Sequence, residues 1–234
     1  MIWKARFGKD SAMEIMYTNE EYVRLLLDIY HNYSTYYAWG AFGAPANKKN
    51  RERYKVPDTL NPGTFLFDCS GFAYKAIPWG WCGDKNKTYG GATYNKIPTD
   101  TNFKKLCYDQ TDDFSRIQKG ECVFMEGHVG IYIGDGMVVE CTSAWDNCVM
   151  ITECQNTGIK TECKHKRKWL LHGKLPFVAY KEESLPAYTT ARLGEGLIKI
   201  ARRSGITFEE IKKLNPEIKA PMYIVRLGQK VRIR

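Results

Sequence analysis

Cys69 is the residue of this 234-residue chain whose position best suits a nucleophile. It stands where an extended segment, residues 65–68, meets a predicted helix over residues 69–77. The unpaired amide groups at a helix N-terminus stabilise a thiolate, which is the reactive form of cysteine. Ser70 and Gly71 follow and keep the turn small and open. These features favour Cys69 over the other seven cysteines as a catalytic thiol.

His128 and Glu140 are the polar pair that could serve such a thiol. His128 opens one expected strand, residues 128–133, and Glu140 lies on the next, residues 137–141, with a Gly-Asp-Gly turn between them. If Gly134 is the centre of this hairpin, the two side chains lie directly opposite each other. A register one step wider places them diagonally on the same face. In both registers the carboxylate can orient the imidazole, as the third member of a catalytic triad does.

The elements expected around these residues are helices first and strands later. Thr18 and Glu21 form a capping-box pattern, and the apolar residues that follow recur at helical spacing. A Gly-, Pro- and Asn-rich stretch, residues 40–63, predicts a loop, and residues 79–120 predict loops and short helices. Further strands are expected over residues 122–125 and 149–152. This order predicts an α+β fold in which N-terminal helices pack on an antiparallel sheet.

The eight cysteines show neither a disulfide framework nor a zinc pattern. Their spacing is irregular, and no Cys-x-x-Cys pair occurs. We therefore expect reduced thiols, mostly buried as small apolar side chains, and neither a metal nor an organic cofactor. Trp79, Trp81 and Trp145 are candidates for lining a substrate groove or for packing in the core.

The charge of the chain limits its partners only in part. Lys and Arg number 35 against 26 Asp and Glu, a formal charge of +9 that attracts nucleic acid, anionic lipid or anionic wall polymer. No segment approaches the ~20 apolar residues of a membrane helix, and no nucleic-acid-binding motif occurs. A basic run, residues 164–168, predicts a solvated loop. The N-terminus lacks the apolar run of a secretory signal, so we expect synthesis in the cytosol.

A second, smaller domain is expected at the C-terminal end. A polar stretch that ends in Pro186 marks a boundary, which predicts domains over residues 1–180 and 187–234. Thr207 and Glu210 form another capping box. Together with a short alternating strand near the C-terminus, the pattern predicts a compact βααβ unit.

Three segments of the first domain resemble a known family. Residues 37–40 (YAWG), 68–72 (DCSGF) and 128–134 (HVGIYIG) look like the motifs of the NlpC-type, papain-like cell-wall peptidases, in the family's order. The resemblance implies Cys69 as nucleophile and His128 as base. Glu140 takes the third position, which is often His in the family.

The resemblance also implies how substrate would be held. Tyr37 would lie near the nucleophile with its hydroxyl on the oxyanion, and Asp68 and Ser70 would hold the stem peptide of peptidoglycan. Trp145 is the third candidate for substrate binding. The bond that the family usually cuts joins D-glutamate to a diamino acid.

The last fifty residues resemble a LysM module. The matching positions are Tyr188, Thr189, Gly194, Glu195, Gly196, Leu197, Ile200, Ala201, Leu214, Asn215, Pro216, Ile218, Gly228 and Gln229. LysM modules bind glycan that contains N-acetylglucosamine through two loops. The resemblance therefore implies glycan-binding residues at Gly194, Glu195, Gly196 and Leu197, and at Asn215, Pro216 and Ile218.

We therefore expect a peptidoglycan endopeptidase with a Cys-His-Glu thiol mechanism, anchored to wall glycan. Without a secretory signal, it fits a phage or prophage endolysin, or a lysin carried in a phage particle. Two alternatives stay open. One is a same-fold thiol acyltransferase or hydrolase that acts on a lipid or thioester, because fold does not fix function. The other is a non-catalytic protein that binds cell wall.

Overall fold

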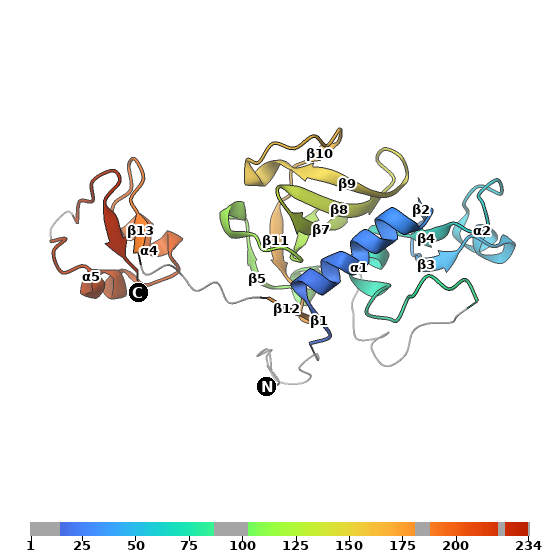
Figure 1. The fold of residues 1–234 in the computed structure, drawn as a ribbon, viewed down its shortest axis with the longest axis horizontal. Helices are drawn as coiled ribbons and strands as arrows, with labels where there is room; N and C mark the ends of the chain where they lie inside the picture. Colours follow the sequence, from blue (N-terminus) through green and yellow to red (C-terminus); the bar gives the residue numbers. More distant parts are fainter. Residues whose placement is uncertain (1–14, 87–102, 181–187, 220–222, 234) are drawn as a thin grey trace. The chain divides into compact units, whose positions relative to one another are not determined.

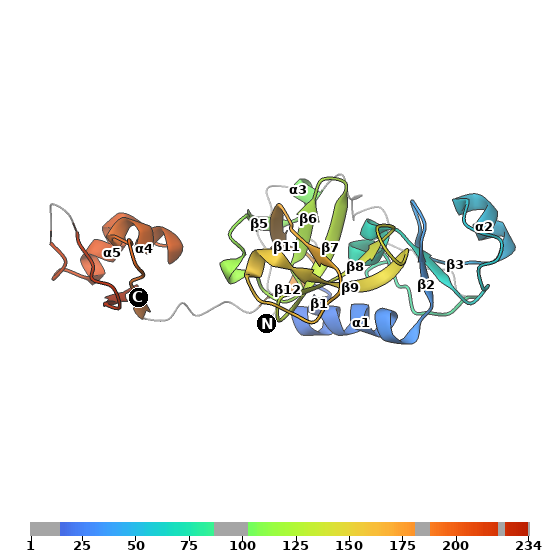
Figure 2. The ribbon, with the colours of Figure 1, turned by 90° about the horizontal axis from the view of Figure 1, so that it is seen from above.

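The computed structural model describes residues 15–86, 103–180, 188–219 and 223–233 (Figures 1 and 2). The chain divides into two compact units, Met1–Tyr180 and Lys181–Arg234, and each has an apolar core of its own. The first ten residues and the polar stretch 181–187, on which the expectations about a signal and a boundary rest, lie outside the described residues.

The first unit starts with the predicted helix. Strand β1 (Tyr17–Thr18) leads into α1 (Asn19–Asn32), and the capping box forms as expected: the Glu21 N–H donates to the Thr18 hydroxyl, and the Thr18 N–H donates to the Glu21 carboxylate. Tyr22 and Leu26 are fully buried on its inner face. None of the described helices is long and apolar enough to cross a membrane.

A seven-stranded sheet forms the body of this unit. Its order is β10-β9-β8-β7-β6-β11-β5, and all neighbours are antiparallel except β10 and β9 (Figure 1). The strands are β5 (Tyr108–Thr111), β6 (Cys122–Met125), β7 (His128–Gly134), β8 (Met137–Thr142), β9 (Cys148–Cys154), β10 (Lys166–Arg167) and β11 (Leu171–Lys174). The four predicted strands are confirmed. The stretch 79–120, expected to be mostly loops and short helices, also contains β5, because pairing with β11 overrides a polar sequence.

The hairpin of β7 and β8 adopts the wider of the two expected registers. Asp135 and Gly136 both have positive φ, 50° and 75°, which is the signature of a two-residue type I′ turn. The turn is therefore centred after Asp135, not on Gly134. Ile131 lies opposite Val139 in this register. When this register is continued along the strands, Glu140 lies opposite Gly130 and diagonally from His128, on the same face of the sheet.

A three-stranded sheet supports the other side of the unit. It has the order β2-β4-β3, with β2 (Thr35–Tyr37) parallel to β4 (Phe65–Phe67) and β3 (Phe42–Pro45) antiparallel to it. The stretch predicted as one loop, residues 40–63, instead contains β3 and α2 (Lys48–Tyr54), which starts because the Asn47 side chain caps it. Strand β12 (Val178–Ala179) pairs with β1.

A helical turn follows β4 directly and begins at Cys69. Over Gly71–Lys75 it has π-helical hydrogen bonding, and all five residues are buried. It packs against β3, β7 and β8. Shorter helices are α3 (Phe103–Leu106) and the 3₁₀ turns Phe114–Arg116 and Gln155–Thr157. The predicted helix at Cys69 is therefore present, but its hydrogen bonds follow a wider spacing than the sequence indicated.

The second unit has the predicted βααβ order. Its elements are β13 (Tyr188–Thr190), α4 (Leu197–Arg203), α5 (Phe208–Leu214) and β14 (Lys230–Arg232), and β13 pairs antiparallel with β14. The capping box of Thr207 and Glu210 starts α5. Leu197, Ile211 and Val231 meet in the core of this unit. The α+β class with a small βααβ domain is thus confirmed.

The close packing around Gly130 gives a test of this fold. An added Cβ would lie 2.6 Å from Val138 and 3.2 Å from Trp169, so we expect Gly130→Ala to lower the free energy of unfolding by about 1–3 kcal/mol. Gly196→Ala is the matched control, because no atom lies within 4 Å of its added Cβ. Chemical denaturation measures both. Equal stability of the two variants would show that the strands pack more loosely than described.

Candidate active site

His128 and Glu140 meet across the β7–β8 hairpin. The Nε2 atom of His128 lies 2.6 Å from Oε2 of Glu140. A carboxylate only accepts hydrogen bonds, so Nε2 carries the proton and donates. In the neutral ring this leaves Nδ1 without a proton, able to act as a base. The predicted contact between His128 and Glu140 is therefore present in the structure, and their roles as base and orienting carboxylate stay a prediction.

The carboxylate of Glu140 is completely buried and fully bonded. Oε1 accepts from the Thr152 hydroxyl at 2.6 Å and from Nε of Arg167 at 3.0 Å, and Nη2 of Arg167 lies 2.9 Å from Oε2. Burial alone would raise the pKa of Glu140, but the hydrogen bonds and charges of His128 and Arg167 outweigh it and hold the pKa below its ordinary value. Glu140 is therefore charged at neutral pH.

Arg167 is a residue of the candidate site that the sequence did not single out. It lies in the run predicted as a solvated loop, and that interpretation was wrong for Arg167, whose side chain is 14% exposed. Strand β10 pairs with β9 and turns this side chain inward to Glu140, between the rings of Trp145 at 4.7 Å and Trp169 at 5.6 Å. No local sequence signal marked this residue, because the alternation of exposed lysines with half-buried His165 and Arg167 arises from the pairing of β10 with β9.

Trp169 and Gly130 set the position of the imidazole. The Trp169 ring stacks on the His128 ring at 5.7 Å between centroids and 15° between planes. Gly130 lies on the same face, two residues after His128 and opposite Glu140. Because it has no side chain, the His128 ring and the Glu140 carboxylate can approach each other across it. The imidazole is thus held by a ring on its face and by a carboxylate at Nε2.

Cys69 lies at the end of the sheet where His128 lies. Cys141, next to last in β8, donates its thiol to the Phe67 carbonyl at 3.4 Å, so β8 passes directly beside the segment that carries Cys69. Burial raises the pKa of the Cys141 thiol well above its ordinary value, and the charges of Asp68 and Cys69 raise it further. The turn packs on both β7 and β8, and β7 starts where β8 ends, so Cys69 and His128 belong to the same end of the sheet. Direct contact between the two side chains stays a prediction.

The carboxylate of Asp68 joins the start of the Cys69 turn to the loop after β2. Oδ1 accepts from the Ser70 hydroxyl at 2.9 Å and from the Gly71 N–H, and Oδ2 accepts from the Gly40 N–H at 2.8 Å. The side chains of Asp68 and Ser70 therefore have partners within the protein. Their contact with a stem peptide stays a prediction.

Tyr37 lies close to the nucleophile in the chain's topology. It pairs with Phe67, two residues before Cys69, and its N–H donates to the Asn147 carbonyl at 2.8 Å. The role of its hydroxyl at an oxyanion stays a prediction. Trp39, in the same segment, is 71% exposed, which is unusual for the largest aromatic side chain. The sequence marked it only as part of a motif.

The three tryptophans weighed as groove residues have different positions. Trp145 is half-buried and stacks on His165 at 4.5 Å, with Arg167 on its ring. Trp79 and Trp81 are 7% exposed and belong to the main core. Of the three, Trp145 therefore remains a candidate for substrate contact.

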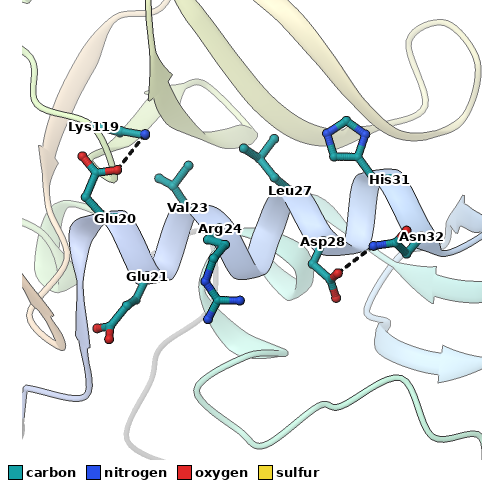
Figure 3. Close-up of a pocket in the computed structure, with 9 residues that line it drawn as sticks. All are labelled: Glu20, Glu21, Val23, Arg24, Leu27, Asp28, His31, Asn32 and Lys119. Atoms are coloured by element: carbon teal, nitrogen blue, oxygen red, sulfur yellow. Dashed lines mark hydrogen bonds and ion pairs between the residues drawn. The ribbon is translucent and has the colours of Figure 1, made fainter.

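A pocket beside α1 does not coincide with these residues. It has a volume of about 530 Å³, runs along α1, and includes Glu20, Asp28, His31 and Lys119 in its lining (Figure 3). Figure 3 shows the side chains of Glu20, Asp28 and His31 leaving α1 in different directions, and the Lys119 ammonium donates to the Glu20 carboxylate at 2.7 Å. No group of three or more His, Cys, Asp or Glu is placed to hold a metal within the described ranges.

The first predicted glycan-binding loop joins β13 to α4. Gly194 is exposed, and an added Cβ at Gly194 or Gly196 would meet nothing within 4 Å. Glu195 forms an ion pair with Arg203 at 2.9 Å. Leu197 is buried in the core, so only its backbone faces the loop. The space beside Gly194 and Gly196 is therefore not filled by other atoms of the described chain.

The second predicted loop follows α5. The Asn215 amide donates to the Arg232 carbonyl at 2.7 Å and accepts from the Arg232 N–H at 2.8 Å, which fixes the loop to β14. Ile218 is buried and Pro216 is exposed. Glycan binding by either loop stays a prediction.

The sequence matches two family models. The NlpC/P60 family matches residues 34–168, which is more than half of the chain, and the LysM domain matches residues 190–234. No curated protein matches the chain. Tyr37, Cys69, His128 and Glu140 lie within the first match.

Two solved structures are distantly similar, both from Trichomonas vaginalis. NlpC1 is 15% identical with a TM-score of 0.37, over 74% of this chain and 47% of that one. NlpC2 is 16% identical with a TM-score of 0.33, over 64% and 46%. This chain thus spans about half the length of either structure, and the family assignment rests on the sequence match. The chain belongs to the NlpC/P60 family and carries a LysM domain at its C-terminal end.

Proposed function

We propose that this protein is a peptidoglycan hydrolase that cuts a peptide bond of the stem peptide, between D-glutamate and a diamino acid, with Cys69 as nucleophile. The observation that carries the proposal is the buried Glu140 carboxylate bonded to Nε2 of His128 at 2.6 Å. It leaves Nδ1 as the free base, at the end of the sheet where the Cys69 turn begins. A histidine bonded to a buried acid beside a cysteine is the arrangement of thiol proteases.

The proposed reaction has two acyl transfers. His128 takes the thiol proton of Cys69, the thiolate attacks the peptide carbonyl, and the imidazolium returns the proton to the leaving amine. Water, deprotonated by His128, then hydrolyses the thioester and restores the thiol. Backbone amides at the start of the Cys69 turn, with the Tyr37 hydroxyl, are the proposed donors to the oxyanion. Trp39 and Trp145 are the proposed aromatic contacts of the stem peptide.

The C-terminal unit is proposed to hold the enzyme on the wall. Its LysM match and its open glycine loop at Gly194 support glycan binding. Its charge supports it as well: residues 187–234 contain eleven Lys and Arg against four Glu, so seven of the nine excess positive charges lie in this unit. A basic module is attracted to a wall that carries anionic polymers. This anchoring favours a wall substrate over the lipid or thioester alternative.

Selective labelling tests the nucleophile. Cys69 is buried, whereas Cys82 is exposed, so accessibility alone would favour labelling of Cys82. We expect iodoacetamide at about pH 6 to label Cys69 first, because only an activated thiol is a thiolate there, and wall clearing should stop in step. Peptide mapping by mass spectrometry identifies the site. Labelling of Cys82 with full retention of activity would contradict the assignment.

His128 and Glu140 should contribute unequally to the rate of turnover. His128→Ala should abolish turnover, whereas Glu140→Gln keeps an acceptor and should lower kcat by on the order of 10²-fold. In Glu140→Gln the imidazolium loses its counter-charge and faces Arg167 alone, so the acid limb of the pH–rate profile should move to lower pH.

The measurement is the pH–rate profile on soluble muropeptide for wild type and both variants, each checked for folding by circular dichroism. Complete loss in both would mean that Glu140 does more than orient the ring. An unchanged acid limb would mean that the charge of Glu140 does not act on His128.

Wall binding should depend on the second unit. Residues 1–180 alone should sediment with purified peptidoglycan much less than the full chain does, and should clear walls more slowly at the same concentration. Co-sedimentation and turbidity measure the two effects. Equal sedimentation of both forms would remove the anchoring role from the LysM domain.

A further inference from the structure

A buried lysine lies in the turn that carries Cys69. Lys75 is 7% exposed, and its ammonium donates to the Ser70 hydroxyl at 2.6 Å. Lysine is almost never buried to this extent unless its charge is paired. Because Ser70 is fully buried as well, this hydrogen bond is shielded from water.

The partner of this charge is Asp68, reached through Ser70. The Ser70 hydroxyl accepts from Lys75 and donates to Oδ1 of Asp68 at 2.9 Å. The same carboxylate accepts from Gly71 and Gly40. One buried positive and one buried negative charge are thus joined by a hydroxyl, and the pair lies on both sides of Cys69 in the chain.

The π-helical turn makes this reach possible. The Ala76 N–H donates to the Gly71 carbonyl, a hydrogen bond over five residues, and Lys75 likewise lies five residues after Ser70. π-turns are rare and occur frequently at functional sites. The turn is also held tightly at Gly71, where an added Cβ would lie 2.0 Å from the Ala41 carbonyl oxygen.

We propose that Lys75 is a positioning residue of the Cys69 thiolate: its ammonium cancels the charge of Asp68 and holds the Ser70–Asp68 link that fixes the start of the turn. The proposal rests on the function proposed above for Cys69. A carboxylate next to a thiol opposes ionisation of that thiol, since like charges repel at short range. With Lys75 in place, the Asp68 carboxylate can accept from the Gly40 and Gly71 N–H groups without its charge opposing ionisation of the Cys69 thiol.

Other titratable groups surround the turn but stay constant in the test. They include Tyr22 on α1, whose hydroxyl donates to the Ala73 carbonyl of the turn at 2.6 Å. On the strands they include Tyr37 on β2, His128 on β7, Glu140 and Cys141 on β8, and Cys148 on β9. A change that follows Lys75 and Asp68 with opposite signs can therefore be assigned to this pair.

The test is the rate of Cys69 alkylation by iodoacetamide against pH, in the full chain. Lys75→Met should move the midpoint up by about one pH unit, which is about a tenfold slower reaction at pH 6. Asp68→Asn should move it down, and the double variant should return to within about threefold of wild type. Lys75→Arg should keep much of the wild-type rate. Lys160→Met, an exposed lysine in a loop, is the control and should change nothing.

Three outcomes decide the matter. Opposite shifts with recovery in the double variant support the proposal. Shifts of the same sign, or no shift in a folded Lys75→Met, overturn it. If Lys75→Met does not fold, Lys75→Gln takes its place and the same signs decide. Alkylation needs no peptidoglycan, so a protein that shows these shifts but cuts no wall would refute the proposed function and leave the role of Lys75 standing.

Discussion

A carboxylate as fully buried as that of Glu140 is stable only if every lone pair facing the protein finds a donor. Four adjacent strands meet this requirement: β7 contributes His128, β8 the carboxylate itself, β9 Thr152 and β10 Arg167. His128 and the bidentate Arg167 contact together keep the charge on Glu140, and that charge fixes the imidazole through Nε2. The strand register that places donors around the Glu140 carboxylate therefore also fixes the orientation of the His128 ring. A one-residue slip of any of these strands would leave a buried charge without its partner.

The Cys69 turn is positioned differently, by close contact between its backbone and the backbone of the loop after β2. Strand β4 leads directly into the Cys69 turn, and the turn presses against the loop after β2 so tightly that Gly71 has no room for a side chain. The Asp68 carboxylate joins the two segments at Gly40 and Gly71. Because β8 contacts the same segment through Cys141, the turn is packed against the end of the sheet where β7 begins and β8 ends.

Local patterns predicted much of this arrangement, because they act over short distances. The capping boxes at Thr18 and Thr207 form as expected, and the Gly-Asp-Gly turn brings His128 and Glu140 together. What could not be predicted depends on pairing between distant segments. Arg167 looked like part of a solvated basic run because the pairing of β10 with β9, which turns it inward, has no local signature. Lys75 was not singled out, since its burial follows from a π-turn that helical spacing does not indicate.

The central claim is that Glu140 holds the proton of His128 on Nε2 and leaves Nδ1 as the base. Nitrogen-15 NMR of the histidine rings in the full chain tests it directly, with His128→Ala to assign the signals among the four histidines. The account predicts that Nε2 of His128 is protonated whether the ring is neutral or charged, and that only Nδ1 gains and loses a proton with pH. A neutral His128 ring with its proton on Nδ1 would contradict the account.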